Sequence, residues 1–257
     1  MRHAVRWAYG LKVSSLTGML ALSCLAQDVH SDYRLSPTVS IHQLAHRVPK
    51  RAAKEFATAM KALEKADPLD AVVHLKEAIS IDPEFVGAMN NLGATYVDMN
   101  MIDLAVDQFE KAIATDPHIS WIYGNLAFTY VIKGDYQAGE RAARQCLNVD
   151  PTSTRGKLVL GIALVMQNRF TAEAERSLRT AEPECREAMY WLGLGYFRKG
   201  QMDAARYQVA SYLDSGDNNQ IMIENAHRLI AALERNARSL QTTSQIRLGV
   251  SPLQQPR

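Results

Sequence analysis

The 257-residue sequence is poor in the features that mark several specialised classes of protein. Its 3 cysteines, 14 glycines and 9 prolines are too few for a disulfide scaffold, a collagenous chain or a low-complexity chain. Its N-terminal apolar stretch, residues 13–26, is shorter than the roughly 20 residues that a membrane-spanning helix needs. The net charge is only +2, so no strong field indicates a nucleic acid or an acidic substrate. With 47% hydrophobic residues, the composition is that of an ordinary globular protein.

Motifs that carry catalysis or metal binding are also missing. The sequence has no GxSxG, no glycine-rich phosphate loop, no HExxH and no cysteine pair spaced for zinc. Its seven histidines are scattered, and only His42 and His46 are spaced four apart. No carboxylate or cysteine beside them completes a metal site. We therefore predict a protein that is not an enzyme and that uses no cofactor and no metal.

The first 26 residues have the pattern of an export signal. Residues 1–12 carry three basic residues and no acid, and the apolar stretch that follows ends in the small residues Cys24 and Ala26. This pattern predicts cleavage near Ala26 and a periplasmic or secreted protein. The alternatives are a lipid anchor through Cys24 and an uncleaved anchor or ordinary N-terminal helix. Removal of residues 1–26 would lower the net charge from +2 to −1, so no nucleic-acid partner is indicated.

A period of 34 residues organises the middle of the chain. Asp-Pro pairs end at Pro83, Pro117 and Pro151, which are 34 residues apart. Small residues recur at fixed positions between them, with larger apolar residues in other positions. The members of this pattern that define the repeats best are Gly93, Tyr96, Ala105, Ala112, Gly161, Gly193 and Ala205.

This pattern resembles the tetratricopeptide repeat, a 34-residue helical hairpin with a Trp-Leu-Gly-Tyr-Ala-Phe-Ala-Pro signature. The repeats fall at 52–85, 86–119, 120–153, 154–185 and 186–219. The fourth carries a one-residue slip, and the last two lack the closing Asp-Pro. The resemblance implies an all-α, right-handed α-solenoid of about five tetratricopeptide (TPR) hairpins with a C-terminal capping helix.

The residue types that recur at fixed positions of the 34-residue period have a physical explanation. Small side chains let paired helices approach closely where they cross. Asn100, Gly134 and Gly200 fall where the first helix of a repeat should end in a left-handed residue. The proline after each aspartate cannot continue a helix.

The segments outside the repeats are predicted to close the solenoid. Residues 27–51 form an N-terminal segment whose 40–48 stretch, beginning with a capping box, predicts a short helix. Residues 220–239 have an apolar stripe on one face and predict a capping helix. Residues 240–257 lack periodicity and are predicted to be disordered.

The resemblance also implies where a partner would bind, because the first helix of each repeat lines a concave groove in this family. When the groove positions of the family are transferred to the equivalent positions of these repeats, they give a set of candidate peptide-binding residues. These are Asn90, Asn91, Trp121, Asn125, Phe128, Arg155 and Tyr190. Asn91 and Asn125 occupy the same repeat position, which implies a short asparagine ladder that could bond a peptide backbone. The alternative is that the asparagines are solvated and the aromatic residues belong to the core. Arg155 is the only basic residue among these positions, which argues against a site for a C-terminal carboxylate.

The predicted function is that of a non-enzymatic scaffold that binds a peptide segment or a partner helix in the groove. The alternative is a cell-envelope assembly or lipoprotein accessory that self-associates weakly through an end helix. The expected partner is a protein or peptide, without nucleic acid or metal.

Overall fold

The computed structural model describes the backbone of residues 46–247 and the side chains of residues 46–238. This part of the chain contains eleven helices and no strand. They are α4 (Lys50–Glu64), α5 (Pro68–Ile81), α6 (Val86–Asp98), α7 (Ile102–Thr115), α8 (Ser120–Lys133), α9 (Tyr136–Val149), α10 (Thr154–Met166), α11 (Ala172–Ala181), α12 (Glu187–Lys199), α13 (Met202–Asp214) and α14 (Gln220–Arg247).

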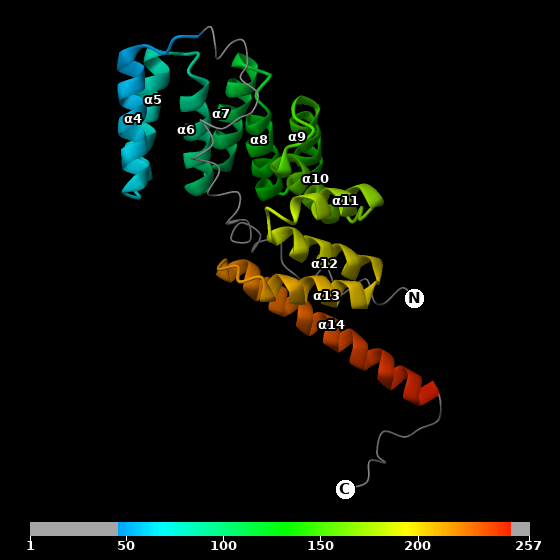
Figure 1. The fold of residues 1–257 in the computed structure, drawn as a ribbon. Coiled ribbons are helices and arrows are strands. Elements are labelled where there is room, and N and C mark those ends of the chain that lie inside the picture. The colour runs from blue at the N-terminus through cyan, green and yellow to red at the C-terminus, as the bar shows by residue number, and fades with distance from the viewer. Residues whose placement is uncertain (1–45, 248–257) are drawn as a thin grey trace.

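The helices pair into five consecutive hairpins, from α4–α5 to α12–α13, and α14 follows the last one (Figure 1). Each hairpin packs on the next, so the core is one continuous layer along the stack. The stack turns along its length: α12 and α13 lie across the direction of α4 to α9 (Figure 1). The predicted all-α solenoid is confirmed. No helix in the described residues is long and apolar enough to cross a membrane.

The small residues of the period lie where the two helices of a hairpin touch. A Cβ added at Gly93 would lie 2.9 Å from the Phe109 ring, and one at Gly161 would lie 2.5 Å from Leu178 Cγ. Ala105, Ala112 and Ala205 are fully buried. The helices therefore approach more closely than larger side chains would allow.

The first helices end as the sequence predicts. Asn100, Gly134 and Gly200 have φ angles of 58°, 85° and 82°, in the left-handed region. Asn168 takes the same role in the fourth repeat, with a φ of 59°. The slip in that repeat lies in the turn after Met166, and α11 is correspondingly short at 10 residues.

The Asp-Pro pairs are turn elements. The carboxylates of Asp82, Asp116 and Asp150 each accept a hydrogen bond from the backbone N–H two residues later, at 3.2, 3.0 and 2.9 Å. The proline between donor and acceptor ends the helix, because it has no N–H to continue it. Pro83, Pro117 and Pro151 therefore set the length of the first three repeats.

The two ends differ from their predictions. Residues 46–49 are not helical, and α4 begins only after Pro49, so the predicted short helix does not extend through Val48. The rest of that prediction and the export signal at 1–26 lie outside the described residues. At the other end α14 continues to Arg247, eight residues past the predicted boundary at Ser239. Polar residues at 241–245 weaken the apolar pattern but break no helix, because neither glycine nor proline occurs before Gly249.

Replacement of Gly193 by alanine tests the close approach of α12 and α13. The added methyl would lie 2.4 Å from Val209 Cγ2 and 3.2 Å from the Ala205 carbonyl oxygen. Because the backbone oxygen cannot rotate away, we expect the free energy of unfolding to fall by about 1–3 kcal/mol, despite the better helix propensity of alanine. Urea unfolding followed by circular dichroism measures this. Arg206→Ala, at an exposed site on α13, should change stability by less than about 0.5 kcal/mol. A Gly193→Ala protein as stable as the wild type would contradict the interpretation.

Candidate peptide-binding groove

The first helices α6, α8, α10 and α12 carry all seven predicted binding residues. Asn90, Asn91 and Asn125 are only 3%, 2% and 3% exposed, and Phe128 and Tyr190 are also buried. Trp121 and Arg155 are half-buried. The groove face is therefore closely packed, and its polar groups have neighbours within the protein.

Three of these residues form a polar chain across three repeats. The Asn125 side-chain amide donates to the Asn90 carbonyl oxygen at 2.7 Å. The Arg155 guanidinium donates to the Asn125 side-chain oxygen. Asn90 lies on α6, Asn125 on α8 and Arg155 on α10, so the chain ties three neighbouring first helices together. Each buried amide in it is bonded to a neighbour, as buried polar groups require.

The ladder inferred for Asn91 and Asn125 takes a different form in the structure. The Asn91 side chain donates to the Gly87 carbonyl oxygen of its own helix at 2.8 Å. Asn125 pairs with Asn90, at the neighbouring repeat position, rather than with Asn91. A peptide that binds these asparagines would have to replace the hydrogen bonds that they make within the protein.

One row of apolar residues lies on α6, α8, α10 and α12. It takes one residue from each of these four helices, at equivalent repeat positions. The row consists of Ala94, Phe128, Ile162 and Leu194, all buried. Ala94 is the smallest of the four side chains and Phe128 the largest, so the row is least bulky in the second repeat.

Three aromatic residues of the fifth repeat, Tyr190, Trp191 and Tyr212, belong to the core. The Tyr190 ring lies 5.2 Å from the Trp191 ring and 6.2 Å from the Tyr212 ring, both edge-on. Burial raises the pKa of Tyr190 to about 12, so its hydroxyl stays protonated at neutral pH. The Trp191 indole nitrogen is buried and has no hydrogen-bond partner among the described residues. The contacts of Tyr190 thus favour its interpretation as a core residue.

A charged cluster at the third and fourth repeats was not evident from the repeat pattern. The Arg144 guanidinium on α9 donates to both carboxylate oxygens of Glu173 on α11, at 2.7 and 2.9 Å. It also bonds Glu140, which in turn accepts from Arg169 at 2.6 Å. These residues come from the third and fourth repeats, and Arg169 lies in the irregular turn between α10 and α11, so a 34-residue period alone could not bring them together.

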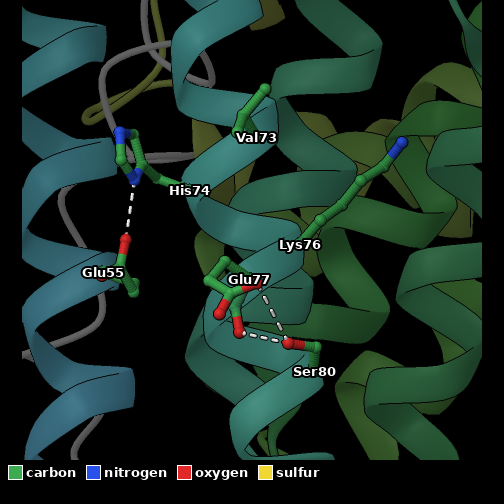
Figure 2. Close-up of a pocket in the computed structure, with 6 residues that line it drawn as sticks. All are labelled: Glu55, Val73, His74, Lys76, Glu77 and Ser80. Atoms are coloured by element: carbon green, nitrogen blue, oxygen red, sulfur yellow. Dashed lines mark hydrogen bonds and ion pairs between the residues drawn. The ribbon is translucent and has the colours of Figure 1, made fainter.

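A shallow depression on the outer side of α4 and α5 has its own polar residues. Figure 2 shows His74 facing Glu55, with 2.7 Å between Nδ1 and Oε2. Ser80 donates to the Glu77 backbone oxygen at 2.8 Å, while Val73 is 62% exposed. The His74–Glu55 contact joins the two helices of the hairpin and the Ser80–Glu77 bond lies within α5, which is the pattern of structural contacts.

The described side chains offer little chemistry. No group of three or more His, Cys, Asp or Glu residues within 46–238 could hold a metal ion. Burial raises the pKa of the Cys146 thiol, and the thiol fills a core position beside Gly124 and Gly156. A protonated, buried thiol is a poor nucleophile. His46, one of the two histidines considered for a metal, instead contacts Asp82 Oδ2 at 2.8 Å and Glu84 Oε2 at 3.3 Å.

Comparisons with known proteins agree with this architecture. Models of the tetratricopeptide repeat match residues 86–119, 108–141 and 172–219. Among solved structures, a thermophilic TPR protein of Thermus thermophilus has a TM-score of 0.57 at 17% identity, over 70% of this chain and 99% of that one. The pilus biogenesis factor PilW has a TM-score of 0.62 at 19% identity, over 79% and 96%. YrrB, described as having an unusual peptide-binding site, has a TM-score of 0.55 at 17% identity, over 72% and 97%.

The stacked hairpins are therefore tetratricopeptide repeats. Residues 86–141 and 172–219 match the repeat models directly, and the fold of these repeats generally serves as a non-enzymatic scaffold for protein–protein interaction.

Asn125→Ala tests the polar chain across the three repeats. The substitution removes a buried donor to Asn90 and a buried acceptor for Arg155. We therefore expect the free energy of unfolding to fall by about 1–3 kcal/mol. Thermal and urea unfolding measure the change. Asn148→Ala, at an exposed site on α9, is the matched control and should lie within about 0.5 kcal/mol of the wild type. Equal free energies of unfolding for the two variants would show that the polar chain does not stabilise the fold.

The Arg144–Glu173 pair predicts a pH-dependent contribution to stability. Hydrogen bonds from Arg144 lower the pKa of Glu173 in the folded protein. The contribution is therefore present above the unfolded pKa of about 4.3 and is lost as the pH falls through the lower folded value. Both side chains are more than 40% exposed, so the wild type should exceed Glu173→Gln by less than about 1 kcal/mol at pH 6.

Urea unfolding at pH 6 and pH 3.5 checks this. The difference between wild type and Glu173→Gln should shrink at the lower pH. Glu64→Gln, at an exposed site on α4, controls for loss of a surface charge. A difference that grows toward low pH would contradict the sign of the linkage.

Proposed function

We propose that this protein is a scaffold that binds a peptide segment or a partner helix on the concave face of α6, α8, α10 and α12. The observation that carries the proposal is the stack of tetratricopeptide hairpins, whose first helices α8 and α10 carry Trp121 and Arg155 as half-buried side chains. An aromatic ring can bury an apolar side chain of a ligand, and a guanidinium can bind its acidic groups.

The composition of the face favours an apolar or amphipathic ligand. Arg155 and Arg198, from α10 and α12, are half-buried basic side chains on these helices, and Arg198 donates to the Val165 carbonyl oxygen. Both arginines thus lie in the fourth and fifth repeats. A ligand that places an acidic residue there fits best. The peptide-binding site named for YrrB gives a precedent on the same fold.

An envelope role is the second candidate. The basic and apolar pattern of residues 1–26 favours export with cleavage near Ala26, or a lipid anchor at Cys24. PilW, a pilus biogenesis factor, shares the fold. In this version the protein assembles cell-envelope components and self-associates weakly. Intact-mass measurement and N-terminal sequencing of the native protein separate a chain that begins at Gln27 from one that keeps Cys24.

A groove variant with a matched control tests the scaffold. Trp121→Ala with Arg155→Met removes two half-buried groove side chains, while Tyr207→Ala removes an aromatic ring that is 69% exposed on α13. Each protein is used to capture partners by crosslinking from the native extract, and circular dichroism verifies its fold. We expect at least a tenfold loss of partner recovery with the groove variant and none with Tyr207→Ala. Equal recovery from both folded variants would rule the groove out as the binding surface.

A further inference from the structure

The second helices form the outer surface of the solenoid. First helices of neighbouring repeats contact one another, α8 with α10 and α10 with α12, whereas neighbouring second helices make few contacts. Helices spread apart on the convex side of a curved stack, so α5, α7, α9 and α11 lie on that side. The Arg144–Glu173 ion pair joins α9 to α11 across it, at 2.7 Å.

The most exposed row of residues on these helices changes its character along the stack. The row holds Val73 on α5, Asp107 on α7, Arg141 on α9 and Arg176 on α11, all exposed. They are 34, 34 and 35 residues apart, the extra residue being the slip of the fourth repeat. The convex surface is therefore apolar and acidic in the first two repeats and basic in the next two.

The two arginines of the row have no ion pair of their own. Among the side chains of residues 46–238, their neighbours Arg144 and Arg179 form salt bridges with glutamates, but Arg141 and Arg176 form none. A shallow depression lies beside Arg176 on α11. Its lining consists of Ala172, Glu175, Arg176, Arg179 and Thr180. Two exposed guanidinium groups on neighbouring helices are thus available to an acidic group from outside the chain.

Helix α7 carries the complementary charge. Asp103, Asp107 and Glu110 share one face of the helix, and Asp103 and Asp107 are 84% and 51% exposed. Their lysine partners, Lys133 and Lys111, are exposed as well. Such surface pairs contribute at most about 1 kcal/mol each, so the two aspartates can exchange them for arginines of another molecule.

Exposed apolar side chains lie next to this acidic face. Four of the large hydrophobic residues exposed in the described part of the chain belong to α5, to α7 or to the N-cap of α7. They are Leu69, Val73, Met101 and Leu104, at 68%, 62%, 43% and 47% exposure. On α11 the corresponding level holds Ala172 and the aliphatic stem of Arg176, which can cover apolar groups while the guanidinium reaches a carboxylate.

We propose that this convex surface binds a second copy of the protein. Helix α7 of each copy lies against α9 and α11 of the other, with Asp107 facing Arg141 and Arg176 of the other copy. A twofold dimer makes this contact twice, because one patch supplies both halves. Exposed ion pairs contribute little individually, so the dimer is weak and dissociates as the salt concentration rises.

The surface does not involve the concave groove. It names the contact for the self-association in the second candidate function, and it rests on the proposed function in that respect alone. The competing surface is α14. Its exposed charges already pair along the helix, Glu224 with Arg228 and Glu234 with Arg238, which leaves less charge for a partner.

Sedimentation velocity over a range of protein concentrations measures self-association of the full chain. We expect a dimer whose dissociation constant rises with salt. Arg141→Glu with Arg176→Glu surrounds Asp107 with like charges and should raise the dissociation constant at least tenfold. Lys61→Glu with Arg235→Glu, at exposed sites on α4 and α14, changes the net charge equally and should leave the dissociation constant unchanged.

Asp107→Arg provides the reciprocal change. Alone it brings three basic side chains together and should weaken the dimer at least tenfold. Added to Arg141→Glu with Arg176→Glu, it restores opposite charges and should return the dissociation constant to within about threefold of the wild type, since the two sites are coupled. Circular dichroism verifies that each variant keeps its helices.

The results separate this surface from the proposed functions. A wild type that stays monomeric overturns the surface together with the self-association of the second candidate. A dimer that Arg141→Glu with Arg176→Glu does not weaken, or that the triple variant does not recover, overturns the convex surface alone. Partner recovery with Trp121→Ala and Arg155→Met tests the groove scaffold independently of all these outcomes.

Discussion

The close approach of the two helices within each hairpin is the constraint on which the rest of the structure depends. Gly93, Gly161 and Gly193 sit where a methyl group would collide with Phe109, Leu178 or Val209. Because the second helix occupies that side, the remaining faces of each first helix are left for the neighbouring repeats and for the concave surface. The regular spacing of the hairpins then aligns equivalent residues of α6, α8, α10 and α12. The apolar row and the polar chain are consequences of this alignment, since a single repeat could supply only one member of each.

The architecture was largely predictable because its determinants are local. A left-handed residue at Asn100 or Gly134 and an Asp-Pro turn at Asp116 depend on a few neighbouring backbone groups, and these recur in the sequence every 34 residues. The ends were harder to predict because they follow no period. Residues 46–49 are held by the contact of His46 with Asp82, a partner 36 positions away. The extension of α14 to Arg247 reflects the absence of a helix breaker, which is a weaker signal than the presence of one.

The groove shows a sharper limit. Repeat phase placed Asn90, Asn125 and Arg155 on the first helices, but it favoured Asn91 as the counterpart of Asn125. The structure instead joins Asn125 to Asn90 at 2.7 Å. Which of two adjacent positions reaches the next helix depends on the rotation and offset between repeats, and a sequence period carries no information about either. The same holds for Arg144 and Glu173, whose meeting needs the irregular turn before α11.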